Sequence, residues 1–266
     1  MNQKLKIVWI GGNHLRHLYF LSQIQKNYSI SAAIIQQREE MIPTPPIYID
    51  EHDKENFIRH FEVRDKTEKK YFGIQTIDCQ KLYIAKDELN SQKTIDFINL
   101  IKPDIVLLFG CDLIKDPLYS RLPRNTINLH GGLSPRYKGT ATMFWPFYFM
   151  EPNHVGSTFH HIVSEPDAGE IVHQTVPKLE RSDGIHDVAC KTIVESAKEM
   201  TRLLEIYEHK RNWQVYKQKG SGRNFRQSDF RAEHLRIIYD LFNDDMVKFF
   251  LDGRIKPMKP NLVKQF

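Results

Sequence analysis

The regular patterning of the chain begins with a short apolar run that ends in glycines. Residues 6–12, KIVWIGG, read as a buried strand, because a strand covered on both faces needs no polar alternation. Residues 13–27 then repeat leucine and isoleucine at helical spacing, and residues 30–35, ISAAII, form a second apolar run. A strand, a helix and a second strand in this order predict the start of a doubly wound parallel sheet.

The middle of the chain continues this alternation after an insertion at 36–90. The insertion holds a proline-rich loop, MIPTPPIYI, and a charged, helix-compatible stretch from 50 to 71. Apolar runs at 105–109 and 126–130 predict two more strands, with a helix before the first of them. Residues 155–163 and 170–177 also read as strands, and a turn at 166–169 would make them neighbours. We therefore expect an α/β fold with a doubly wound, Rossmann-like and mostly parallel sheet.

The strongest helical pattern spans residues 182–210. Ser182 or Asp183 is placed to cap this helix, and its apolar face would be formed by Ile185, Val188, Thr192, Met200, Leu203 and Tyr207. After Trp213 the chain becomes basic and turn-rich, and a compact helical piece follows at 232–255. These patterns predict a main domain at 1–210 and a small helical and hairpin extension at 211–266. The apolar part of the extension could pair two subunits in a homodimer.

Composition narrows the class of protein. The 266 residues include 41% hydrophobic positions, and the formal charge of +5 comes from 38 basic and 33 acidic residues. This slight, mixed excess suits anionic small molecules better than nucleic acid, which would call for a concentrated basic face. Three widely spaced cysteines fit a reducing compartment. We see neither a signal peptide nor an apolar run of about 18 residues, so we expect a cytoplasmic protein without membrane insertion.

The candidate chemistry lies at the end of the strand predicted at 126–130. Asn128 and His130 point to the same side of that strand, because side chains alternate, and open α/β sheets bind ligands at this edge. The segment SEPDAGEIV offers an acid, Asp167, followed by small residues. A histidine can move protons, an asparagine amide can stabilise an oxyanion, and a carboxylate can orient the histidine. No covalent nucleophile stands out, which favours direct attack of an amine or water on an acyl group.

These segments resemble the folate-dependent formyltransferases. The resemblance rests on INLH, on the Leu-x-Pro-x-Tyr-Lys-Gly segment after it, and on PDAGEIV, whose aspartate follows His130 by about 37 positions. It covers roughly residues 4–210, the predicted catalytic domain. The family includes glycinamide ribonucleotide, methionyl-tRNA and nucleotide-sugar amine formyltransferases. The resemblance implies that Asn128 stabilises the oxyanion, that His130 manages the amine proton, and that Asp167 positions His130.

The resemblance also implies a co-substrate, 10-formyltetrahydrofolate, and no metal. The residues expected around the folate are Cys111, Asp112, Leu113, Ile114, Gly131, Ile162, Val163, Ser164 and Glu165. The residues expected around the acceptor are Gly12, Asn13, Arg64, Tyr137, Lys138 and Arg223. The chain departs from the family in one place, where His-Gly-Gly-Leu-Ser-Pro at 130–135 replaces the usual His-Pro-Ser-Leu-Leu-Pro. Two glycines free this loop and let a ligand approach its backbone more closely.

Several other segments contain residues that could form a binding or metal site. The IGGN turn after the first strand lacks the full dinucleotide fingerprint, so an anion-binding turn is favoured over NAD binding. His160 and His161 point to opposite faces and cannot easily share a metal ion with His154 or His173. Cys111 is treated as a small buried residue rather than a nucleophile. Two mixed aromatic and basic stretches are solvated faces or acceptor contacts, through Arg59, Arg64 and Tyr71 in one and Arg223, Phe225 and Arg226 in the other.

The predicted function is transfer of a formyl group to a primary amine, with a nucleotide-linked amino sugar as the expected acceptor. Residues 211–266 leave little room for an RNA-binding domain, and a purine-pathway enzyme would lack both the 36–90 insertion and this tail. The alternatives are a 10-formyltetrahydrofolate hydrolase and a formyltransferase for another amine, such as a hydroxamate precursor in siderophore assembly. A non-catalytic nucleotide-binding scaffold is the third hypothesis.

Overall fold

The computed structural model describes residues 5–220 and 222–266, and within them the main body is a seven-stranded sheet. Its strand order is β3-β2-β1-β4-β5-β7-β8, and the pairs from β3 to β5 are parallel whereas β5, β7 and β8 pair antiparallel. The strands are β1 (Ile7–Gly12), β2 (Ile30–Gln36), β3 (Gln80–Ile84), β4 (Ile105–Phe109), β5 (Thr126–His130), β7 (Ser157–His161) and β8 (Ile171–Thr175). The predicted doubly wound, Rossmann-like fold is confirmed.

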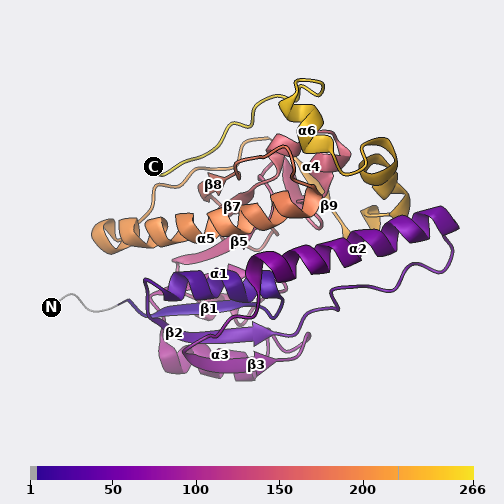
Figure 1. Ribbon diagram of the computed structural model, residues 1–266. Coiled ribbons are helices and arrows are strands. Elements are labelled where there is room, and N and C mark those ends of the chain that lie inside the picture. Colours follow the sequence, from indigo (N-terminus) through magenta and orange to yellow (C-terminus); the bar gives the residue numbers. More distant parts are fainter. Residues whose placement is uncertain (1–4, 221) are drawn as a thin grey trace.

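Helices cover both faces of the sheet, as Figure 1 shows. The longer ones are α1 (Leu15–Gln25), α2 (Glu51–Phe72), α3 (Gln92–Ile101) and α5 (Ile185–Lys210). Shorter elements are β6 (Tyr137–Gly139), which pairs with β9 (Arg223–Phe225), together with α4 (Trp145–Tyr148) and α6 (Met246–Leu251). Single helical turns lie at Tyr119–Arg121, Pro152–His154, Gln227–Asp229 and Ala232–Leu235, and a π turn lies at Ile237–Leu241.

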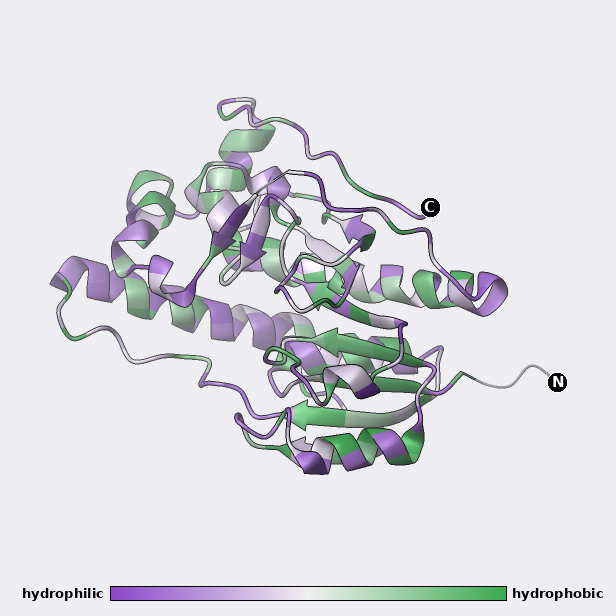
Figure 2. Ribbon diagram, turned by 180° about the vertical axis from the view of Figure 1, so that it is seen from behind, coloured by the Kyte–Doolittle hydropathy of each residue, from purple (hydrophilic) through white to green (hydrophobic). Residues whose placement is uncertain are grey.

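The alternation along β1 explains the layers. Ile7 and Trp9 join the core that α1 and α5 cover, whereas Val8 and Ile10 join the core under α3. Both sets are buried, which is why the sequence of this strand is apolar without alternation. Figure 2 shows the hydrophobic strands at the centre of the molecule and the largely hydrophilic surface of α2. The central strands β1, β4 and β5 are thus buried on both faces, and because they are parallel their carboxyl ends lie at the same edge of the sheet.

The carboxyl-terminal segment shares a core with the main body. Ala232, Leu235 and Met246 pack with Phe57 of α2 and Val188 of α5 in one apolar cluster. The predicted helical piece at 232–255 is a series of short turns and the brief helix α6. The division into 1–210 and 211–266 stays a prediction, and residues 1–4 and 221 lie outside the described part of the chain. In that part, no helix combines the length and the apolar character needed to cross a membrane.

The start of α5 differs from the expectation. The helix begins after Gly184, and Asp183 instead accepts a hydrogen bond from the Glu180 amide at 2.8 Å. The amide of Ile185 donates to Asp244 Oδ1 at 2.9 Å. The predicted caps Ser182 and Asp183 are therefore wrong, because a residue distant in sequence supplies the carboxylate. The predicted apolar face is confirmed, since each of its six residues is buried.

Candidate active site

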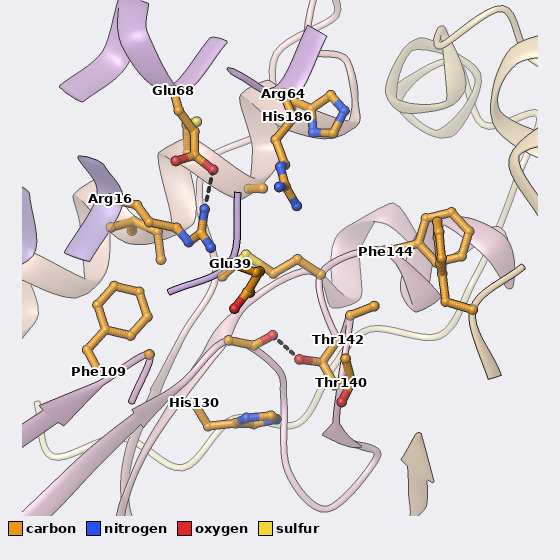
Figure 3. Close-up of a pocket in the computed structure, with 18 of the residues that line it drawn as sticks. Arg16, Glu39, Arg64, Glu68, Phe109, His130, Thr140, Thr142, Phe144 and His186 are labelled. Atoms are coloured by element: carbon orange, nitrogen blue, oxygen red, sulfur yellow. Dashed lines mark hydrogen bonds and ion pairs between the residues drawn. The ribbon is translucent and has the colours of Figure 1, made fainter. Parts of the chain in front are cut away.

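A cavity of about 550 Å³ lies at the carboxyl edge of the sheet. Its lower wall comes from the ends of β4 and β5 and the loop after them, and its upper wall comes from α1, α2, α5 and residues 39–43 (Figure 3). Asn128, His130 and Asp167 line it together. The predicted strand-end pair and the distant acid therefore converge on one space.

His130 faces oxygen atoms with both ring nitrogens. Its Nε2 lies 2.9 Å from the Tyr137 carbonyl oxygen, and its Nδ1 lies 3.3 Å from Asp167 Oδ1. A neutral imidazole has one N–H, so only the charged ring donates to both partners. Burial lowers the pKa of His130, and the Asp167 charge and the Tyr137 carbonyl act against this by favouring the charged ring. These two partners thus partly offset the effect of burial on the pKa of the His130 ring.

Asp167 is held in a strained turn. Its φ of 53° lies in the left-handed region, which is uncommon for residues with a side chain. Its Oδ2 accepts a hydrogen bond from the Gly139 amide at 3.0 Å. Burial would raise the pKa of Asp167, but His130, His160 and the Gly139 amide outweigh it and lower the pKa to about 2. Asp167 is therefore a carboxylate at neutral pH and can orient His130.

His160 joins the group, and the sequence analysis did not assign it a role. Its Nδ1 donates to the His161 carbonyl oxygen at 2.8 Å, which leaves Nε2 to accept from Asn128 Nδ2 at 3.1 Å. The same Nε2 lies 3.4 Å from Asp167 Oδ1 and can donate to this oxygen only when the ring is charged. His160 therefore lies between the amide of Asn128 and the carboxylate of Asp167. His160 lies opposite Asn128 on the neighbouring strand, and this pairing depends on the register between β5 and β7. The sequence alone does not give that register.

This geometry suits acyl transfer to an external nucleophile. One N–H of Asn128 donates to His160 Nε2. Within residues 5–220 and 222–266 no protein group accepts from the second N–H, which can donate to an oxygen in the cavity. His130 can take up and return a proton while the Asp167 carboxylate stabilises its charged form. The arrangement stabilises negative charge on an oxygen and moves a proton beside it.

The sequence model of one family, Formyl transferase, matches residues 57–204, more than half of the chain. This chain belongs to the formyl transferase family. The predicted resemblance and the prediction of an enzyme are therefore confirmed, and Asn128, His130 and Asp167 all lie within the matched residues.

Solved formyltransferases share the fold at low sequence identity. A phosphoribosylglycinamide formyltransferase from Anaplasma phagocytophilum has 14% identity and a TM-score of 0.58, over 85% of this chain and 99% of that one. A sugar N-formyltransferase from Shewanella has 15% identity and a TM-score of 0.56, over 88% and 87%. The formyltransferase PseJ from Anoxybacillus kamchatkensis has 16% identity and a TM-score of 0.51, over 91% and 96%.

The two segments expected around the folate of this formyltransferase lie side by side. Ile114 and Ile162 pack in the same apolar cluster, and Cys111 packs against it and lines the cavity. Burial raises the pKa of the Cys111 thiol to about 12, so this thiol stays protonated at neutral pH. Leu113 and Val163 are exposed beside them. Leu113 and Val163 therefore stay predicted folate contacts, and neither lines the cavity.

The remaining folate-side residues have other contacts. Asp112 accepts hydrogen bonds from Gln36 and Arg38 at 2.8 and 2.5 Å. Ser164 and Glu165 are exposed, and Glu165 lies 3.9 Å from Lys138 Nζ. Gly131 lines the cavity. These four residues stay candidates for folate contact.

Gly132 gives the departure from the family pattern a physical reason. A Cβ at this position would lie 2.6 Å from the Tyr137 carbonyl oxygen and 2.7 Å from His130 Nε2. The space taken by a side chain is thus occupied by His130 and its partner. The close approach was expected for a ligand, whereas in the structure the protein itself makes it.

The acceptor-side predictions divide in the structure. Arg64 lines the cavity, whereas Gly12, Asn13, Tyr137, Lys138 and Arg223 are not among its lining residues. Asn13 accepts from the Arg38 amide at 2.9 Å, the Tyr137 hydroxyl donates to Glu151 at 2.5 Å, and Arg223 lies over the Phe149 ring at 4.3 Å. A Cβ at Gly12 would meet the His17 ring. Of the alternatives, Arg59 lies over the Tyr239 ring at 4.4 Å and Phe225 stacks on Trp145 at 4.4 Å.

The upper wall of the cavity was mostly missed by sequence reasoning. Arg16 comes from α1, His60 and Glu68 from α2, and His186 from α5. These residues lie on the faces of helices in positions that a sequence pattern treats as ordinary polar sites. The sequence offered one signal, because each of these polar residues is spaced at helical intervals from apolar residues that face the core.

Proposed function

We propose that this formyltransferase transfers a formyl group from 10-formyltetrahydrofolate to the primary amine of a nucleotide-linked amino sugar. The observation that carries the proposal is the convergence of Asn128, His130 and Asp167 on a cavity that extends well past them. The donor supplies the formyl group. The PseJ structure holds a UDP-linked formamido sugar and tetrahydrofolate, and this similarity supports the same pair of ligands here.

The residues would divide the work as follows. The free N–H of Asn128 donates to the formyl oxygen as it becomes negative. The amine nitrogen forms a new bond to the formyl carbon, and the bond from that carbon to N10 of the folate breaks. His130 Nδ1 takes the proton that the amine loses, because Nε2 donates to the Tyr137 carbonyl oxygen, and the Asp167 carboxylate stabilises the charged ring. The proton then passes to N10 as tetrahydrofolate leaves. His160 holds the amide of Asn128 in place and faces the carboxylate of Asp167, so loss of His160 would affect both residues.

The test is formyl transfer by the purified protein. The protein is incubated with 10-formyltetrahydrofolate and a panel of UDP- and dTDP-linked amino sugars, and the formylated product is measured by mass spectrometry. Formyl transfer to one of these sugars is expected. Formate release without any amine would identify a hydrolase, and transfer only to other amines would contradict the nucleotide-sugar acceptor.

A variant separates catalysis from mere binding. His130→Ala is expected to lose about 10²–10⁴-fold in rate, because the proton is no longer taken up by a positioned base. Its circular dichroism spectrum should match the wild type. A rate equal to wild type would support the non-catalytic scaffold instead.

A further inference from the structure

The upper wall of the cavity holds a guanidinium that the protein leaves without a carboxylate. Arg64 projects from α2 toward the cavity, on the side opposite His130 (Figure 3). Its Nη2 donates to the Met41 carbonyl oxygen at 2.7 Å. Across residues 5–220 and 222–266, no acidic side chain lies within ion-pair distance of it. The guanidinium also lies over the Phe61 ring at 4.7 Å. A half-buried guanidinium without a carboxylate partner is costly unless a ligand completes its hydrogen bonds.

The nearby acids are already paired with other arginines. Glu68 lies 2.6 Å from Arg16 Nη1, and Glu39 lies 3.2 Å from Arg38 Nη2. The remaining acid of the upper wall, Glu40, is exposed to solvent. Of the two arginines that line the cavity, Arg16 has a carboxylate partner and, in the described structure, Arg64 has none.

Buried polar atoms without partners lie on the same wall. Among the described residues, Arg64 Nε, His186 Nε2 and one carboxylate oxygen of Glu68, Oε2, are buried and have no hydrogen-bond partner. His186 is 5% exposed and lines the cavity with Arg64. Burial, followed by the charge of Arg64, lowers the pKa of His186 to about 3, so its ring is neutral and adds no repulsion. Burial lowers the pKa of Arg64 to about 10, which leaves it charged at neutral pH.

We propose that Arg64 binds an anionic oxygen group of the acceptor, a phosphate or a carboxylate, and that it selects acceptors that carry one. A guanidinium matches the planar fork of such groups better than an ammonium does. The anion would sit on the upper wall while the amine lies beside His130 on the lower wall. This inference rests on the proposed function, because it assigns a part of the acceptor.

The test measures equilibrium binding, which does not depend on formyl transfer. Wild type, Arg64→Met and Arg64→Lys are titrated by calorimetry with inorganic pyrophosphate, uridine diphosphate and glucuronate. We expect wild type to bind at least one of them, Arg64→Met to bind it at least about tenfold more weakly, and Arg64→Lys to be intermediate. Pyrophosphate and uridine diphosphate report a phosphate site, and glucuronate reports a carboxylate site.

The matched control is Arg59→Met, on the same helix. Arg59 is exposed, lies over the Tyr239 ring and does not line the cavity, so its loss should leave anion binding within about twofold of wild type. Adding the bound anion should raise the melting temperature of wild type but not that of Arg64→Met, because a ligand stabilises only a protein that binds it. An arginine with a purely structural role would leave this ligand-induced shift unchanged.

Two results would overturn the inference. The first is that wild type binds none of the three anions. The second is that Arg64→Met binds them as tightly as wild type does. The proposed function fails separately, if no amine is formylated while binding of an anion still depends on Arg64.

Discussion

At the scale of single residues, His130 is governed by two opposing influences. Burial disfavours its charged form, and the Asp167 carboxylate at 3.3 Å favours that form. Asp167 and the Tyr137 carbonyl, the partners of its two ring nitrogens, therefore help to set the pKa of His130. Activity should follow the neutral form of His130, since that form can take up the proton of the amine.

The pH dependence of kcat/KM follows from these influences. Because the pKa of His130 is lowered from 6.5, activity should persist below pH 6.5 and fall only at more acidic pH, as the ring becomes charged. Asp167→Asn removes the strongest effect that raises this pKa. The acid limb of the variant should therefore move to lower pH, with a rate lowered overall.

Profiles of kcat/KM for wild type and Asp167→Asn between about pH 4.5 and pH 8, the range around the ordinary histidine pKa, check this. Asp96→Asn, on the exposed surface of α3, is the control and should keep the wild-type profile. An acid limb that moves to higher pH in Asp167→Asn would contradict the assigned influence.

Gly132 gives a second prediction at this scale. Gly132→Ala would place a methyl group 2.7 Å from His130 Nε2 and 2.6 Å from the Tyr137 carbonyl, so the ring must move. We expect kcat to fall at least about tenfold and stability to fall by about 1–3 kcal/mol, as in other overpacked sites. Steady-state kinetics and urea unfolding measure both.

Gly131→Ala is the comparison for this change. Its nearest neighbour would be the flexible end of Met143 at 3.0 Å, so its effects should be smaller. Equal losses in both variants would show that general loop flexibility, rather than the approach to His130, is what the glycines provide.

At the scale of elements, α5 depends on a cap from a distant segment. Asp244 accepts a hydrogen bond from the Ile185 amide at 2.9 Å, and its φ is 60°. Burial raises the pKa of Asp244 to about 6. Its ionised form is thus disfavoured in the folded protein, and the stability that its protonated form contributes is lost as the pH rises through about 6.

Substitution at Asp244 tests this cap. Asp244→Asn keeps an oxygen acceptor, tolerates the left-handed conformation and removes the charge, whereas Asp244→Ala loses the cap. At pH 7.5 the Asn variant should be at least as stable as wild type, and the Ala variant should be less stable than Asn by about 1 kcal/mol or more. Chemical denaturation of the three proteins measures this, and equal stability of Ala and Asn would speak against capping.

The same elements connect the tail to the catalytic cavity. α2 and α5 each line the cavity on one side and pack against residues 232–247 on another. The tail therefore supports two walls of the cavity, and of its described residues only Gln227 and Phe230 line it. Figure 1 shows the tail beside the ends of α2 and α5.

At the scale of the whole molecule, several buried histidines make the fold sensitive to acid. His17, His60, His130 and His186 are buried, and burial lowers the pKa of each. In the unfolded chain each would titrate near 6.5, so the unfolded state binds more protons below that pH. The free energy of unfolding should therefore decrease as the pH falls below 6.5.

Each such histidine contributes up to about 1.4 kcal/mol per pH unit in this window, and Asp244 opposes the trend by gaining its proton near pH 6. Urea unfolding at several pH values from neutral to mildly acidic measures the net slope. We expect lower stability at acidic pH. Constant or rising stability on acidification would show that these rings are not kept neutral in the folded protein.

Local patterns in the sequence determined much of this molecule. Apolar runs predicted the strands that became β1, β2, β4 and β5, because each is buried on both faces. They missed β3, a largely exposed edge strand with little apolar signal. The alternation of strand residues placed Asn128 and His130 together, and the small residues after Asp167 predicted its turn. Those inferences needed only neighbours in the chain.

Tertiary structure alone decided the contacts between distant segments. The role of His160 requires the register between β5 and β7, the cap of α5 comes from Asp244, and the unpaired charge of Arg64 depends on which acids reach other arginines. Hydrogen bonds and ion pairs act over a few ångströms, and no local pattern encodes which distant groups come that close. The sequence thus predicted Asn128, His130 and Asp167 as candidate catalytic residues, and the packing of α1, α2 and α5 decided the cavity that they face.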